Sequence, residues 1–104
     1  MEQRICLQSW VPVRASNSSK SEMVTSMLFG EVCAVIGKEG EWLHVRLIED
    51  GYLGWVPDMY LRNFSDYAGL EWVVLRGVGA FLLGDKENKI MLSPGSCVPR
   101  MGHL

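Results

Sequence analysis

The sequence lacks the cysteine pattern of a metal-binding or disulfide-stabilised domain. Its three cysteines, Cys6, Cys33 and Cys97, lie 27 and 64 residues apart, so no Cys-x-x-Cys pair exists for a zinc knuckle or a thiol redox motif. An odd number of cysteines also leaves no closed disulfide framework. Because Cys6 and Cys33 lie within apolar runs, we expect both to be buried and Cys97 to be more exposed. The sequence therefore predicts no metal site and no cofactor.

An excess of basic charge and a long apolar run are also missing. Ten basic and twelve acidic residues give a net charge of −2; residues 1–64 carry all of it (six minus eight), and residues 65–104 balance (four minus four). A protein that binds nucleic acid would show a basic patch. No stretch reaches the roughly 18 apolar residues of a membrane span, and the first residues lack the apolar region of a secretory signal peptide. We therefore predict no nucleic-acid partner and no membrane span.

The sequence does contain short β-branched and aromatic runs, which recur about every ten residues between clusters of Gly, Asp, Asn and Ser. This spacing is typical of strands, and no segment shows the apolar stripe of an amphipathic helix. We expect strands at residues 4–8, 11–14 (a short continuation of the first), 23–29, 32–36, 42–47 and 52–57, a tight helical turn at 58–61 and a closing segment at 62–64. The pattern predicts a small all-β barrel or sandwich.

The clearest local pattern is a hairpin of residues 32–36 and 42–47, joined by the glycine-containing segment 37–41. Apolar and polar residues alternate in its second strand, which predicts one buried and one outer face. The residues expected on the buried face are Leu43, Val45 and Leu47. We expect His44 to be exposed on the outer face.

The last third of the chain indicates a second, incomplete unit. Residues 65–70 are mostly small and polar, and we interpret them as a linker. We expect strands at 71–75, 81–83 and 89–92 and a turn at 85–88, and residues 91–98 weakly repeat the pattern of residues 27–33. The predicted organisation is a barrel at 1–64, a linker at 65–70 and a partial repeat at 71–104. Half a barrel leaves unpaired strand edges, so we expect the natural protein to continue past Leu104.

An ordered set of motifs resembles a bacterial SH3-like domain. The motifs are Val13-Arg14, Ser21-Glu22, Gly30-Glu31, the Trp-Leu-x-Val of residues 42–45 and the Gly-Tyr-x-Gly-Trp-Val of residues 51–56. Over about residues 3–64 they are similar to the first SH3-like domain of NlpC-type cell-wall cysteine peptidases, including dipeptidyl-peptidase VI-like enzymes. Residues 70–104 resemble the start of the second SH3-like domain of such enzymes. The resemblance implies an all-β fold, a small SH3-like barrel followed by an incomplete second SH3-like repeat.

The resemblance also implies an activity for the parent protein. Enzymes of this family hydrolyse the bond between γ-D-glutamyl and a diamino acid in wall-derived peptides that begin with a free L-alanine. Their nucleophile is a cysteine paired with a histidine in a separate papain-like domain. Cys97 does not resemble the family's Asp-Cys-Ser-Gly turn, and His44 and His103 lack the family's histidine context. We therefore expect this chain not to be an enzyme, and its location to be the cytoplasm or periplasm of a bacterium.

In the family, the first SH3-like domain packs on the catalytic domain and closes one end of the substrate cleft. A peptide ammonium group held there needs a carboxylate, and a closed pocket needs an aromatic wall. We predict Glu22 as the carboxylate and Tyr52 as the aromatic wall, with Tyr60 as a second candidate and Trp55 completing the set. The implied partners are a downstream catalytic domain of the same protein and a wall-derived peptide.

Alternative interpretations use the same residues. The chain fits a stand-alone module that holds a wall peptide or a protein partner, and Glu22 fits a solvated carboxylate. Trp55, like Trp42, fits structural packing. Tyr52, Trp55 and Tyr60 resemble the groove of eukaryotic SH3 domains, which binds polyproline II peptides. The chain lacks the acidic run that such domains use to bind a basic residue, which argues against that function.

Overall fold

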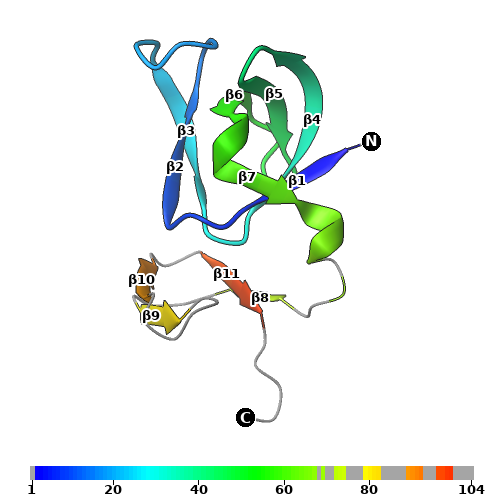
Figure 1. The fold of residues 1–104 in the computed structure, drawn as a ribbon. Coiled ribbons are helices and arrows are strands. Elements are labelled where there is room, and N and C mark those ends of the chain that lie inside the picture. Colours follow the sequence, from blue (N-terminus) through cyan, green and yellow to red (C-terminus); the bar gives the residue numbers. More distant parts are fainter. Residues whose placement is uncertain are drawn as a thin grey trace.

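The computed structural model describes residues 2–67, 69, 72–74, 79–82, 89–92 and 96–99, and this part of the chain contains strands and short 3-10 helices but no α-helix. Seven antiparallel strands form one curled sheet in the order β3-β2-β6-β5-β4-β1-β7 (Figure 1). The strands are β1 (Gln3–Cys6), β2 (Trp10–Arg14), β3 (Met23–Leu28), β4 (Val32–Glu39), β5 (Trp42–Leu47), β6 (Leu53–Pro57) and β7 (Leu61–Asn63). The all-β, SH3-like prediction is confirmed. No helix in the described part is long and apolar enough to cross a membrane.

The tight turn after β6 is also confirmed. It forms the 3-10 helix η1 (Asp58–Tyr60), and a second 3-10 helix, η2 (Phe64–Asp66), follows β7. Strand β7 lies near the closing segment predicted at 62–64, but it pairs only with β1 and forms one edge of the sheet, which it does not close.

The hairpin of β4 and β5 differs from the prediction in its turn. Strand β4 continues to Glu39, so the connection is only two residues long and not the predicted loop 37–41. Gly40 takes φ +58, which a tight turn of this kind requires. The pairing of β4 with β5 shifts register between Val35 and Gly37, and this bulge leaves Ile36 exposed.

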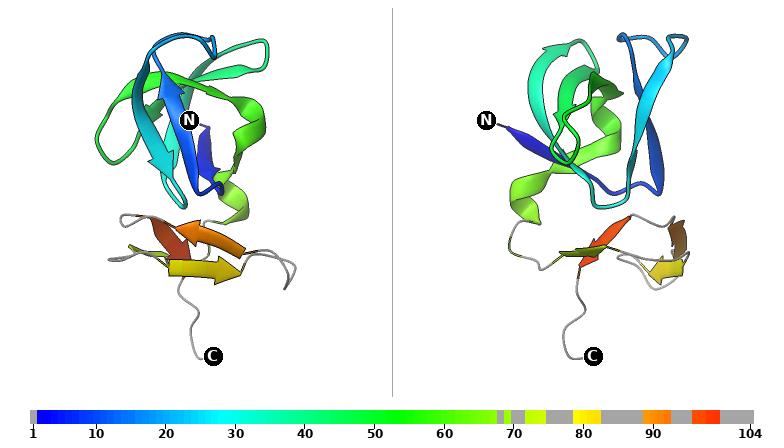
Figure 2. Two further views of the ribbon diagram at one scale, coloured as in Figure 1. Left: turned by 90° about the vertical axis from the view of Figure 1, so that its left-hand side faces the viewer. Right: turned by 180° about the vertical axis from the view of Figure 1, so that it is seen from behind.

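The sequence predicted residues 11–14 as a continuation of the first strand, and this prediction is wrong. Strand β1 ends at Cys6 and pairs with β4 and β7, whereas β2 pairs with β3 and β6. The segment between the two strands carries the chain across to the other layer of the barrel (Figure 2). As a result, the outer residues of β2 lie beside those of β6.

The core lies inside the curled sheet, and its residues confirm the alternation predicted for β5. Its buried members include Leu43, Val45 and Leu47, which are 1%, 0% and 3% exposed. Cys6 and Cys33 are fully buried in the same cluster, as expected for thiols that pack as small hydrophobic side chains.

The remaining strands form two short pairs on one side of the barrel (Figures 1 and 2). Strand β8 (Trp72–Val74) pairs with β11 (Cys97–Pro99), and β9 (Gly79–Leu82) pairs with β10 (Lys89–Leu92). Strands β8, β9 and β10 lie at or near their predicted positions, and the predicted turn at 85–88 lies outside the described residues. Ser65 and Asp66 of the predicted linker belong to η2. The division into barrel, linker and partial repeat stays a prediction.

Strand β11 contacts the barrel at the turn after β3. The backbone amide of Cys97 donates a hydrogen bond of 2.6 Å to the carbonyl of Phe29. Gly30 takes φ +86, and a Cβ atom added there would collide with the backbone of Cys97. Glycine is therefore required at this position both for its backbone angle and for the close approach of β11.

Candidate functional site

The outer face of β2, β6 and β5 carries a continuous row of three large side chains. Arg14 pairs with Trp55, and Trp55 pairs in turn with His44. The His44 and Trp55 rings stack with centroids 4.4 Å apart and planes 3° from parallel. His44 is therefore half-buried against a tryptophan, and the expectation of an exposed histidine is corrected. The alternation predicted its face, but the stacking depends on the register between β5 and β6.

An aromatic groove lies beside this row and has a volume of about 330 Å³. Trp10 and Tyr60, which are 51% and 38% exposed, contribute the most open rings. The groove takes residues from β2 and the segment before it, from the β2–β3 loop, from β5 and from the end of β6 with η1. Its lining is Gln8, Trp10, Val11, Pro12, Arg14, Ser19, Trp42, Pro57 and Tyr60.

Arg14 is the charged residue of the aromatic groove. Its Nη1 donates a hydrogen bond of 3.0 Å to the carbonyl of Ser21, which holds the guanidinium against the β2–β3 loop. The hydroxyl of Ser21 lies 2.8 Å from the carbonyl oxygen of Ser18 and 3.1 Å from that of Ser16, so the loop is internally braced. No carboxylate among the described residues forms an ion pair with Arg14.

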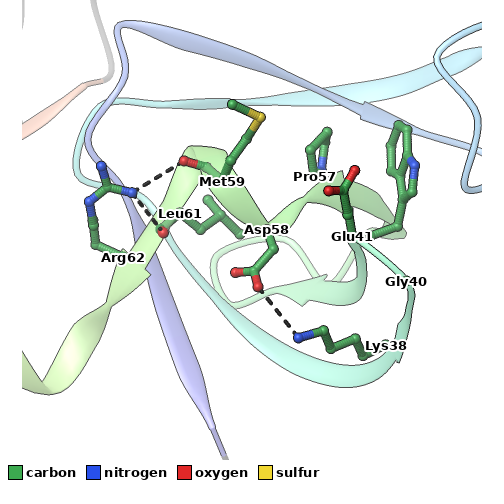
Figure 3. A pocket seen from close by; sticks show the side chains of 9 residues that line it. Lys38, Gly40, Glu41, Pro57, Asp58, Met59, Leu61 and Arg62 are labelled. Carbon is green, nitrogen blue, oxygen red and sulfur yellow. Dashed lines mark hydrogen bonds and ion pairs between the residues drawn. The ribbon is translucent and has the colours of Figure 1, made fainter.

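A second, charged pocket of about 620 Å³ is shown in Figure 3. It adjoins the groove, because Trp42 and Pro57 line both. Its other lining residues are Lys38, Gly40, Glu41, Asp58, Met59, Leu61 and Arg62. Most of its charges are engaged within the protein. Asp58 lies 2.6 Å from Nη1 of Arg4 and 3.6 Å from Nζ of Lys38, and Arg62 donates to the backbone carbonyls of Met59 and Leu61. Glu41 has no ion-pair partner among the described residues.

Glu22 and Tyr52 lie at the same end of the sheet. The amide of Ala15 donates to the carbonyl of Glu22, which extends the β2–β3 ladder beyond Arg14, and Tyr52 directly precedes β6 at that end. The carboxylate of Glu22 is exposed and has no hydrogen-bond partner among the described residues. Tyr52 is 54% exposed, and its amide donates to Oδ1 of Asp50 at 3.1 Å.

The other two predicted site residues are placed elsewhere. Tyr60 follows the opposite end of β6 and lines the aromatic groove, whose lining does not include Glu22, Tyr52 or Trp55. Trp55 lies between the two ends, stacked on His44. The structure thus brings Glu22 and Tyr52 to one end of the sheet and assigns Tyr60 to a separate groove. The roles predicted for the four residues remain predictions.

Sequence reasoning missed the contribution of β2 to this surface. Trp10, Pro12 and Arg14 alternate with the buried Val11 and Val13, so the alternation within residues 10–14 was the available sign of an outer face. Which strands lie beside that face follows only from the long-range pairing of β2 with β6.

The described residues contain no cluster of three or more His, Cys, Asp or Glu side chains suited to a metal ion. The thiols are poorly suited to nucleophilic attack. Burial raises the pKa of Cys6 to about 11 and that of Cys33 to about 12. The pKa of Cys97 is also raised, mainly by burial and to a smaller extent by the negative charge of the nearby Glu31. All three are therefore protonated at neutral pH, whereas a catalytic cysteine needs a lowered pKa.

Comparisons with known proteins agree with this geometry. Residues 13–61 match a family described as the bacterial dipeptidyl-peptidase Sh3 domain. The chain is also similar to the crystal structure of an NlpC/P60 family protein from Bacillus cereus ATCC 10987, with a TM-score of 0.78 and 16% sequence identity. The match covers 97% of this chain and 48% of the other, so the chain spans about half the length of that protein. No curated protein matches the chain.

Proposed function

We propose that this chain is a non-catalytic module of a bacterial cysteine peptidase acting on cell-wall peptides, because residues 13–61 match the family described as the bacterial dipeptidyl-peptidase Sh3 domain. The family match is the observation that carries the proposal. The protonated thiols support it, since none of the three provides a ready nucleophile. The catalytic cysteine and histidine would belong to a downstream NlpC-type domain, on which this module packs.

The module would restrict the substrate cleft to peptides with a free N-terminal L-alanine, cleaved between γ-D-glutamyl and a diamino acid. Two features support this role. The carboxylate of Glu22 is exposed and unpaired among the described residues, so it is available to an incoming ammonium group. Tyr52 lies at the same end of the sheet and is 54% exposed, which suits a pocket wall.

The test replaces Glu22 in the full-length enzyme. Glu22→Gln keeps the shape of the side chain but removes its charge, so KM for peptides with a free amino terminus should rise roughly tenfold. N-acetylated peptides should be cleaved as before, and thermal stability should not change. Glu39→Gln, which removes another exposed carboxylate on the β4–β5 hairpin, is the matched control and should leave KM unchanged.

Two results would contradict the proposal at different levels. Unchanged kinetics in Glu22→Gln would remove Glu22 from the substrate site. A full-length protein without an Asp-Cys-Ser-Gly turn and a later histidine would rule out the peptidase, and the chain would then be a stand-alone binding module.

A further inference from the structure

Two rows of directly paired residues cross the outer face of the sheet. Residues that pair directly across antiparallel strands project from the same face. One row runs from Met23 on β3 through β2 and β6 to His44 on β5, and a shorter row beside it joins Arg46 of β5 to Leu53 of β6. The six side chains of these rows, which we call the arginine face, are Met23, Arg14, Trp55, His44, Leu53 and Arg46.

The arginine face has the composition of a protein interface. Met23 and Leu53 are 47% and 54% exposed, and Trp55 is half-buried. Tryptophan, methionine and arginine are enriched at the core of protein interfaces, whereas lysine, aspartate and glutamate are depleted there. The arginine face contains all three of the enriched types and none of the three depleted ones. It therefore resembles a docking surface more than an ordinary water-exposed surface.

The two arginines of this face lack acidic partners. Arg4, on the other side of the sheet order, lies 2.6 Å from a carboxylate oxygen of Asp58. By contrast, no carboxylate among the described residues forms an ion pair with Arg14 or Arg46. The barrel as a whole has more acidic than basic residues, so these arginines form a local patch of the opposite sign. A partner that covers them must present acidic side chains.

The combination of charge and apolar surface favours one kind of partner. A second copy of the chain would bring two arginine faces together, which like-charge repulsion opposes. A polyanion would match the arginines but leave Met23 and Leu53 without apolar contacts. An acidic protein surface with an apolar centre satisfies both sets of side chains.

The position of the arginine face connects it with the substrate residues proposed above. Met23 directly follows Glu22, and Leu53 directly follows Tyr52. The arginine face therefore begins beside the two residues that we place at the substrate cleft. A catalytic domain that shares this cleft must lie against the same end of the sheet.

From these observations we infer that the arginine face docks the catalytic domain of the parent enzyme, through acidic side chains of that domain that pair with Arg14 and Arg46. Met23, Trp55 and Leu53 form the apolar centre of the contact. This inference rests on the proposed function, and it adds the docking surface and the charge of the surface that covers it.

The test measures the oxidation of methionine by hydrogen peroxide in the full-length enzyme, because a covered thioether reacts slowly. Met23 would lie in the contact, and Met59 of η1, which is 72% exposed, is the internal reference. Mass spectrometry of proteolytic fragments gives both rates. The double variant Arg14→Glu/Arg46→Glu would repel the docked domain, so Met23 should be oxidised at least about tenfold faster than in the wild type. The rate at Met59 should not change.

Three controls separate undocking from unfolding and from a general charge effect. Met27 is fully buried in the core and should stay unreacted as long as the barrel is folded. Arg62→Glu makes the same charge change on β7, at the opposite edge of the sheet from β3, and should keep the wild-type rate at Met23. Arg46→Glu alone, at an exposed position, keeps the test valid if the double variant does not fold. It should raise the rate at Met23 by about threefold.

Two results would overturn the inference. The first is an equal rate at Met23 in the wild type and in both charge variants while Met27 stays unreacted. The second is a wild-type rate at Met23 that rises on dilution as the molar mass falls from dimer to monomer, which would assign the face to a second copy. Because no substrate is present, either result is distinguishable from an unchanged KM in Glu22→Gln, which tests the proposed function.

Discussion

The six residues of strand β5 alternate between two faces with different chemistry. The inner face carries Leu43 and Val45, which are at most 1% exposed and belong to the hydrophobic core cluster. The outer face carries Trp42, which lines two cavities, and His44, which stacks on Trp55. Core residues and residues of the outer surface thus alternate along one strand. Substitutions at neighbouring positions should therefore have separable effects.

The largest effect should come from a charge on the inner face. Val45 is fully buried, so Val45→Asp would place an unpaired carboxylate in the core at a cost of several kcal/mol, about the whole stability of a small domain. We expect the barrel to be unfolded by circular dichroism at 25 °C. Arg46→Asp, one residue away on the outer face, should stay folded. A cooperative melt of Val45→Asp would mean that the two faces are not distinct.

The next largest effect should come from the contact between the turn after β3 and strand β11. Gly30→Ala combines a strained φ with a collision against the backbone of Cys97, and should cost about 2–4 kcal/mol in urea unfolding. Gly51→Ala is the matched control, because Gly51 has φ +77 but no atom near the position of the added Cβ. It should cost only about 1–2 kcal/mol. Equal costs would mean that the contact of β11 adds nothing to stability.

A smaller effect concerns pH. Burial raises the pKa of Cys33 from about 9 to about 12, so between these values the unfolded chain loses a proton that the folded chain keeps. Stability from this thiol is complete below pH 9 and falls as the pH rises, by up to about 1.4 kcal/mol per pH unit. From pH 8 to pH 10, the wild type should lose about 1.4 kcal/mol more than Cys33→Ala does. Parallel pH profiles would show that the Cys33 thiol is not shielded from water.

The smallest effect belongs to the outer face. His44→Ala removes the ring stacked on Trp55, and should cost only about 0.5–1.5 kcal/mol while shifting tryptophan fluorescence to longer wavelength. His44→Phe should retain most of the stability. A loss comparable with that of a core substitution would show that the outer face also holds the barrel together.

Local patterns predicted the inner face well. The alternation in residues 42–47 gave both the strand and its buried residues, because each side chain in a strand points opposite to the last. The tight turn at η1 and the burial of Cys6 and Cys33 were also predictable, since each depends on only a few neighbouring residues.

The outer surface was less predictable because it depends on long-range pairing. Arg14 meets Trp55 across 41 positions of sequence, and nothing in either segment specifies that register. Trp10 and Tyr60 therefore line one groove, although no local pattern of residues predicts that they lie close together. The predicted length of the β4–β5 turn was wrong for a local reason. Strand β4 pairs with β5 beyond the bulge after Val35 and as far as Glu39, which leaves a two-residue turn at Gly40.

The position of Trp42 has a consequence for how the two cavities respond to ligands. Together with Pro57, Trp42 lines both the aromatic groove and the charged pocket. A ligand that reorients the Trp42 ring from one side changes the volume left on the other. Two ligands that both contact Trp42 in this way would be thermodynamically linked, and each would change the affinity of the other by the same factor.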